Sequence, residues 1–286
     1  MPRTLESLLD ELERDRSLRE PGRMRERGEA LDRLEIHRAC GASGEGAPGP
    51  AQLRERVEAL CAGFEAVDAE LQQRIRRDVQ RGAGAHALLE WARSAGPDGD
   101  LPGDGYDYLD TLVSGILQIE EPDMPAAPMA GMVFYQPTPA RHIFGMLART
   151  ALDERDVLVD LGSGLGQVPL LAAICTGARC VGIEWEAAYV RCARRCAQAL
   201  DLGRVTFVQG DVRAADLSAG TVFYLYTPFE GRMLREVLDR LKAEADTRVI
   251  RVCTLGPCTA TVARERWLHG EDEWRPDRPA VFRSTR

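Results

Sequence analysis

A glycine-rich turn follows a short apolar run in the second half of the chain. The run, residues 157–161, reads V-L-V-D-L and is followed by Gly162, Gly164, Gly166 and Gln167. Glycine tolerates positive φ angles and lets a ligand approach the backbone closely, and a helix that begins after the turn favours negative groups. The G-x-G-x-G spacing differs from the G-x-G-x-x-G of dinucleotide-binding proteins. The turn by itself is compatible with NAD, FAD or another adenosine-containing ligand.

The apolar runs that follow also end in acids. The second run ends at Glu184, 18 residues after Gly166, where a carboxylate can accept hydrogen bonds from both hydroxyl groups of a ribose. The third run is followed by Asp211 and Val212, and the Asp211 carboxylate can accept a hydrogen bond from an adenine amino group. Each acid taken alone could equally well lie in a solvent-facing loop. Three successive strand ends of this kind, Asp160 included, predict an adenosine-binding site.

Strand and helix patterns alternate through this half of the chain. Short β-rich runs occur at 156–161, 179–184, 204–209, 221–226 and 247–253, with helical patterns at 167–176, 186–201 and 229–243. This alternation predicts an α/β fold with a Rossmann-like, doubly wound parallel sheet, in which ligands bind outside the carboxyl ends of the strands. Two last strands are expected around 263–268 and 279–284.

The N-terminal third of the chain has helical periodicity instead. Helical patterns cover 3–39, with a break at Pro21-Gly22, and then 51–81 and 84–93. We therefore expect an N-terminal all-α domain over 1–95, an acidic connector with a helix over 96–134, and the ligand-binding domain over 135–286. The all-α domain is expected either to cover the site or to mediate a homodimer.

Composition excludes several classes of protein. The chain has 286 residues, with 37 basic and 45 acidic side chains and a formal net charge of −8. An acidic chain without a basic block is a poor candidate for nucleic-acid binding. No apolar run is long enough for a membrane span or a secretion signal, so we expect a cytoplasmic protein. The eight cysteines and four histidines show no ligand spacing, so no metal site is expected.

The segment from about 133 to 256 resembles the class I S-adenosylmethionine-dependent methyltransferases. Within them it is most similar to the non-SET histone lysine methyltransferases of the telomeric-silencing-disruptor type. The resemblance rests on D-L-G-S-G-L-G-Q at 160–167 and on Y-Q-P-T at 135–138, where that family has a Tyr-Gly-Glu-Thr loop. It implies S-adenosyl-L-methionine as the cofactor and S-adenosyl-L-homocysteine as its product.

The resemblance also implies a role for each motif residue. Tyr135 and Thr138 would lie over the methionine end of the cofactor. Its amino-acid and sulfonium region would face Asp160, Gly162 and Gly164, with Gln167 beside the turn. Its ribose would bind Glu184, and its adenine would bind Asp211 and Val212.

The fourth strand end is where catalysis is expected. It reads Tyr226-Thr227-Pro228-Phe229, where many amino-directed methyltransferases carry Asn/Asp-Pro-Pro-Tyr/Phe. The histone family has an asparagine at the position matching Thr227, so a hydroxyl replaces an amide clamp for the acceptor amine. Tyr226 and Phe229 could form an aromatic wall around the acceptor and the cationic methyl group. Tyr226, Thr227 and Phe229 are therefore the predicted catalytic residues.

We expect a methyltransferase that acts on a nitrogen or oxygen of a small molecule or peptide in bacterial metabolism. A protein lysine or arginine methyltransferase and a non-catalytic cofactor-binding protein are the alternatives. An NAD-dependent dehydrogenase is a further alternative, if the G-x-G-x-G spacing does not exclude a dinucleotide. Metal ions, nucleic acids and membranes are not expected as partners.

The acidic excess lies in one stretch that leads to the Tyr135 loop. Between Arg93 and Arg141 there is no base and there are eight acids: Asp98, Asp100, Asp104, Asp107, Asp110, Glu120, Glu121 and Asp123. One hypothesis is that this stretch lines the substrate entrance and attracts a cationic acceptor. The alternative is a solvated connector.

Overall fold

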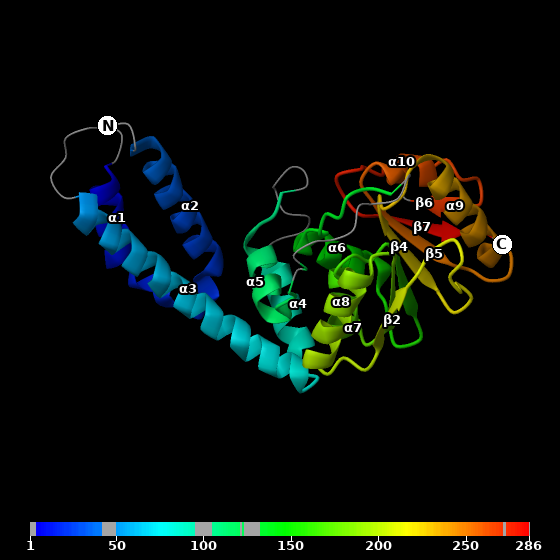
Figure 1. Cartoon of the computed structure of the whole chain (residues 1–286), viewed down its shortest axis with the longest axis horizontal. Helices are drawn as coiled ribbons and strands as arrows, with labels where there is room; N and C mark the ends of the chain where they lie inside the picture. The colour runs from blue at the N-terminus through cyan, green and yellow to red at the C-terminus, as the bar shows by residue number, and fades with distance from the viewer. Residues whose placement is uncertain are drawn as a thin grey trace. The chain divides into compact units, whose positions relative to one another are not determined.

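The computed structural model of the chain describes residues 4–41, 50–94, 105–120, 122, 132–270 and 273–285. The chain forms two compact units, and the boundary between them lies between Arg74 and Ile75 (Figure 1). This division differs from the predicted boundary after residue 95. The helix α4 (Gly84–Ser94) packs against α6 (Ala140–Thr150) and α7 (Gln167–Thr176), so it belongs to the second unit.

The first unit is helical, as its periodicity predicts. It contains α1 (Leu5–Arg14), two short 3-10 turns (Arg16–Arg19 and Pro21–Arg23), α2 (Met24–Gly41) and the first part of α3 (Pro50–Gln80). The break at Pro21-Gly22 is therefore a 3-10 turn. Leucine side chains of α1 and α2 pack with Phe64 of α3 in one apolar core. The buried Arg27 guanidinium donates to the Asp68 carboxylate, with Nε–Oδ1 at 2.9 Å, and so joins α2 to α3.

The second unit is built on a seven-stranded sheet. Its strands are β1 (Val157–Leu161), β2 (Arg179–Glu184), β3 (Val205–Gln209), β4 (Val222–Tyr226), β5 (Arg251–Leu255), β6 (Leu268–Gly270) and β7 (Ala280–Ser284). The spatial order is β3-β2-β1-β4-β5-β7-β6. Strands β1 to β5 are parallel and β7 is antiparallel to both of its neighbours. The predicted Rossmann-like α/β sheet is confirmed.

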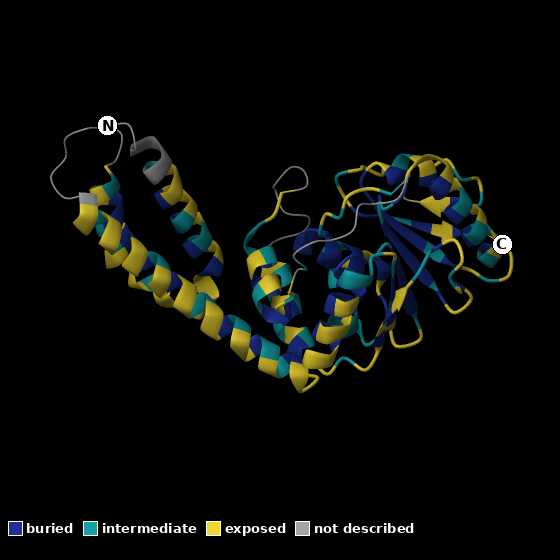
Figure 2. Cartoon of the chain, in the orientation of Figure 1, coloured by how far each residue is buried: buried dark blue, intermediate teal, exposed yellow. Residues whose placement is uncertain are grey.

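Helices cover both faces of the sheet, and its strands are largely buried (Figure 2). The apolar side of α9 (Gly231–Ala245) packs on one face, against alternate residues of β1, β4 and β5. Helices α6, α7 and α8 (Ala187–Ala199) lie on the opposite side in Figure 1. Alternate residues of each strand therefore face different layers. Asp160 of β1 is the register partner of Tyr224 of β4, so both side chains lie on the face away from α9.

Two predicted strands are displaced in the structure. The fifth strand covers 251–255 instead of 247–253, because residues before it form a loop in which Arg248 donates to the Leu217 and Gly220 carbonyl groups. The sixth covers 268–270 instead of 263–268, since residues 263–267 form turns after α10 (Cys258–Val262). Helix α6 was not predicted. No helix in the described part of the chain is long and apolar enough to cross a membrane.

Candidate functional site

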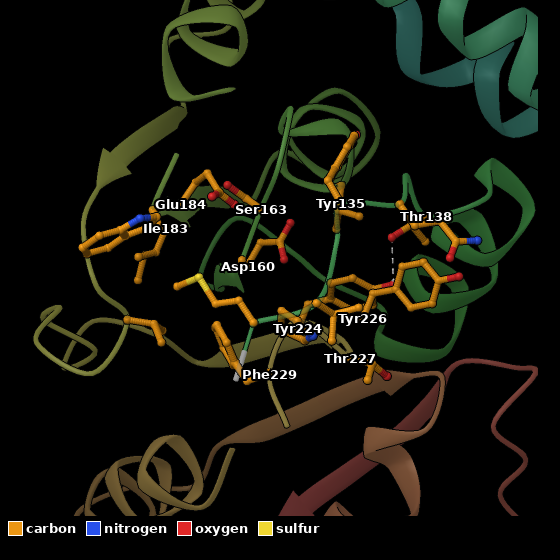
Figure 3. A pocket seen from close by; sticks show the side chains of 18 of the residues that line it. Tyr135, Thr138, Asp160, Ser163, Ile183, Glu184, Tyr224, Tyr226, Thr227 and Phe229 are labelled. Atoms are coloured by element: carbon orange, nitrogen blue, oxygen red, sulfur yellow. Dashed lines mark hydrogen bonds between the residues drawn. The ribbon is translucent and has the colours of Figure 1, made fainter. Parts of the chain in front are cut away.

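A cavity of about 590 Å³ lies at the carboxyl ends of β1, β2 and β4. Ten of the twelve predicted site residues line it: Tyr135, Thr138, Asp160, Gly162, Gln167, Glu184, Val212, Tyr226, Thr227 and Phe229. Figure 3 shows side chains from these strand ends gathered around one space. The volume is within the usual range for small-molecule sites, about 300–1,000 Å³. Strand ends far apart in sequence thus form one site, as predicted.

The glycine turn is held between two other segments of the site. Gly162 and Gly164 both have positive φ, at 89° and 52°. A Cβ atom at 164 would lie 2.1 Å from the Tyr135 ring, and one at 162 would lie 2.6 Å from Pro228. Glycine is therefore required at both positions by conformation and by space. Gly164 does not line the cavity but lets Tyr135 pack directly over the turn.

The Glu184 carboxylate is fixed by the backbone around it. Its Oε2 accepts from the Gly164 amide and its Oε1 from the Glu186 amide, both at 2.8 Å. Each carboxylate oxygen has a second lone pair, so both can still accept a hydroxyl group from a ligand. Burial raises the pKa of Glu184, and the backbone hydrogen bonds oppose that rise. This geometry suits the paired hydroxyl groups of a ribose.

Asp160 is a buried acid that faces the cavity. Its side chain is 3% exposed and accepts no hydrogen bond from the described residues. Burial, aided by the charge of Glu184, raises the pKa of Asp160 well above its usual range. A buried carboxylate without a partner is stabilised by a cation. S-adenosylmethionine carries an ammonium and a sulfonium group, so the residues present fit this cofactor.

The segment 132–138 crosses the site and is anchored at several points. The Val133 amide donates to the carbonyl of Pro228, which follows β4, at 3.2 Å. The Tyr135 ring lies 5.1 Å from that of Tyr189, between ring centroids. The Thr138 hydroxyl is 3.2 Å from the Tyr224 phenol (Figure 3). These contacts hold Tyr135 and Thr138 at the cavity, which both residues line.

Thr227 lines the cavity, but its hydroxyl serves another element. The hydroxyl donates to the Leu255 carbonyl at 3.0 Å and accepts from the Cys258 amide at 3.1 Å. In Figure 3 it points away from Asp160. The hydroxyl therefore ties the end of β4 to the end of β5 and to the start of α10. The neighbouring Pro228 carbonyl, a second acceptor at this strand end, already binds Val133.

Tyr226 and Phe229 occupy the two sides of this strand end. Tyr226 is partly buried and shares a strand face with Tyr224, so its ring faces the cavity. Phe229 is 3% exposed and belongs to the core beneath α9. Of the three predicted catalytic residues, Tyr226 and Thr227 carry a hydroxyl group, and that of Thr227 binds Leu255 and Cys258.

Asp211 does not line the cavity. Its carboxylate binds the Arg213 guanidinium at 2.7 Å and accepts from the Arg213 amide at 2.8 Å. These bonds hold the pKa of Asp211 below its usual range. Val212 is buried in the cavity wall. The cavity lining at the end of β3 therefore includes Val212 and not the Asp211 carboxylate.

The described acids of the acidic stretch have structural partners. Asp107 caps α5 (Tyr108–Leu117) by accepting from the Leu109 amide at 2.7 Å. Asp110 accepts from the amides of Asp107 at 2.8 Å and Ala140 at 2.7 Å, so it joins α5 to α6. Glu120 pairs with Arg195 at 3.3 Å. None of these three lines the cavity, and the other five acids lie outside the described residues.

Sequence reasoning missed several aromatic residues of the site. Tyr224 lies two residues before Tyr226, and strand periodicity could have placed both on one face. Trp185 directly follows the strand-end acid Glu184, and its side chain is 40% exposed. Phe134 is 79% exposed at the cavity, beside the motif residue Tyr135. Nothing in the local pattern marked Phe134.

Comparisons with known proteins give a match to one family model and matches to solved structures. Residues 132–210 match the family model described as Histone methylation protein DOT1. An RNA methyltransferase from Salinibacter ruber, solved with S-adenosyl-L-homocysteine, is 31% identical, and the match covers 52% of this chain and 92% of that one at a TM-score of 0.44. A putative methyltransferase from Escherichia coli is 18% identical over 55% and 89% of the two chains, at a TM-score of 0.42. No curated protein matches the chain.

Proposed function

We propose a function on the premise that this chain belongs to the class I S-adenosylmethionine-dependent methyltransferases. We infer that it methylates a nitrogen or oxygen atom of a small molecule or peptide. S-adenosylmethionine, when bound, supplies the methyl group on a positively charged sulfur. The acceptor's lone pair forms a bond to the methyl carbon as the sulfur–carbon bond breaks, which leaves S-adenosylhomocysteine and releases one proton from the acceptor.

The charge of the cavity lining indicates which class of acceptor the cavity can bind. Its charged lining residues are Asp160, Glu184, Glu186 and Glu230, and no Lys, Arg or His lines the described cavity. A wall of acids repels a phosphodiester chain, whereas nucleic-acid-binding sites depend on basic side chains. The cavity therefore favours a neutral or cationic acceptor over RNA. This supports the small-molecule or peptide class.

The chain's own residues act mainly by positioning. Glu184 is placed to hold a ribose, and Asp160 to hold the positive groups at the other end. Tyr226 then borders the space left for the acceptor. Methyl transfer to a nucleophilic atom needs alignment of the reacting atoms more than acid–base catalysis, and alignment can supply several kcal/mol, about 7–11 in favourable cases.

Protein lysine methylation is a second candidate, favoured by the match of residues 132–210 to a histone methylation family. The engagement of the Thr227 hydroxyl disfavours it, because its proton is donated to the Leu255 carbonyl and its position is fixed by the Cys258 amide.

A labelled-methyl assay tests the proposal. The full chain is incubated with S-adenosylmethionine tritiated at the methyl group and with three acceptor sets: small amines and phenols, basic peptides, and RNA transcripts. We expect label in one of the first two sets, and at least about tenfold less with Glu184→Gln when S-adenosylmethionine is below saturation. Glu120→Gln, an exposed acid outside the cavity, is the matched control and should retain activity. Label in RNA alone would overturn the proposal. Cofactor binding without turnover on any set would support the non-catalytic alternative.

A further inference from the structure

Among the acids that line the cavity, Glu230 has neither a structural contact nor a role in binding the cofactor. Glu184 is bound by two amides, Asp160 faces the positive end of the cofactor, and Glu186 accepts from the Ala188 amide at 2.9 Å to cap α8. Glu230 remains. Its backbone carbonyl begins α9, but its carboxylate makes no hydrogen bond or ion pair with the described residues.

Aromatic and apolar residues line the cavity together with the exposed Glu230. Glu230 directly follows Phe229, and the cavity lining also includes Tyr226 and the 79% exposed Phe134. A large apolar side chain so exposed at a cavity is favourably covered by an apolar ligand. A positive charge would be attracted both by the unpartnered carboxylate and by the faces of the aromatic rings.

We propose that the acceptor is an aromatic molecule or side chain with a positive charge, and that Glu230 determines this specificity by contacting the charge. The inference rests on the proposed function and names its substrate class. An ammonium group held by Glu230 keeps its proton and has no lone pair for the methyl group. The methylated atom is therefore a second nitrogen or oxygen of the same molecule, and the charge bound at Glu230 serves recognition.

Three phenols of similar size but different net charge test the proposal. Tyramine is a cation, 4-(2-hydroxyethyl)phenol is neutral and 4-hydroxyphenylacetate is an anion at pH 7. Their dissociation constants are measured by calorimetry on the full chain saturated with S-adenosylhomocysteine. We expect tyramine to bind about fivefold more tightly than the neutral phenol, as for a partly exposed ion pair, and the anion to bind most weakly. Added salt should reduce the difference.

Two variants assign the effect to one residue. Glu230→Gln should abolish the preference for tyramine over the neutral phenol. Asp239→Asn changes the net charge equally on the exposed side of α9, where Asp239 pairs with Arg235, and should preserve the preference. Equal affinity for all three phenols, no tyramine binding at about 10 mM, or an unchanged preference in Glu230→Gln overturns the inference. Failure of S-adenosylhomocysteine to bind would instead overturn the proposed function.

Discussion

The hydroxyl oxygen of Thr138 lies 3.2 Å from the phenolic oxygen of Tyr224, and both side chains are buried. This contact joins the segment over the cavity to the middle of β4 (Figure 3). Burial raises the pKa of Tyr224 well above its usual range, so the phenol keeps its proton at any physiological pH. The hydrogen bond therefore persists and holds the segment against the sheet.

Removing either hydroxyl should loosen this segment. Thr138→Val and Tyr224→Phe should each lower the free energy of unfolding by about 1 kcal/mol, because each leaves a buried partner unsatisfied. The double variant should lose less than the sum of the two, as a double-mutant cycle in urea would measure. Additive losses would show that the two hydroxyl groups do not interact.

Asp160 should limit the stability of the ligand-free protein. Its pKa is raised in the folded state, so the folded protein holds this proton more tightly than the unfolded chain does. Stability from this group is present at low pH and is lost as pH rises from the ordinary Asp range through the raised value. Asp160→Asn should therefore stabilise the free protein near pH 7, by on the order of 1 kcal/mol.

The same variant should bind the cofactor less well. Binding of a cationic ligand favours the ionised Asp160 carboxylate, so the affinity of the wild type for S-adenosylmethionine should rise as the pH rises through the raised pKa of Asp160. Asp160→Asn should show weaker affinity with a flatter pH profile. A variant that is both less stable and equally tight in binding would contradict this role.

Thr227 is expected to act on stability. Its hydroxyl bridges Leu255 and Cys258, so Thr227→Ser should retain nearly full stability, whereas Thr227→Val should lose about 1–3 kcal/mol. Chemical denaturation of both variants measures the difference. If Thr227→Ser and Thr227→Val unfold alike while methyl transfer is kept in Thr227→Ser and lost in Thr227→Val, the hydroxyl acts on the substrate instead.

Asp110 should behave as a structural acid. It accepts two amide hydrogen bonds at the start of α5 and α6, so Asp110→Ala should lower the free energy of unfolding by about 1–2 kcal/mol. Glu120→Gln, which breaks one exposed ion pair, should change it by less than about 1 kcal/mol. Neither should alter the salt dependence of KM for an acceptor. A change in that dependence would restore the idea that the acidic stretch attracts the substrate.

The strand ends were predictable because their chemistry is local. The glycine turn, Glu184 and Val212 each follow an apolar run, and parallel strands bring their carboxyl ends to one edge of the sheet. The direction of the Thr227 hydroxyl was not predictable in this way, because its partners, Leu255 and Cys258, lie in the next strand and helix.

Two further differences between the prediction and the structure concern Asp211 and the unit boundary. Asp211 is a strand-end acid in sequence, but an arginine two residues later binds its carboxylate outside the cavity. The unit boundary lies in α3 because α4, which has an ordinary helical pattern, packs on α7 of the sheet domain. The Asp211 contact is local but follows from no periodic pattern, whereas the packing of α4 on α7 joins segments that are far apart in the sequence.

Binding of S-adenosylhomocysteine to the full chain tests the cofactor site most directly. Calorimetric titration should give one site per chain with micromolar or tighter affinity, and Glu184→Gln should weaken it at least about tenfold, since the amide cannot accept at both oxygens. A parallel titration with NAD should show no saturable binding. Saturable binding of NAD, or equal S-adenosylhomocysteine affinity in the wild type and Glu184→Gln, would contradict the assignment of this cavity.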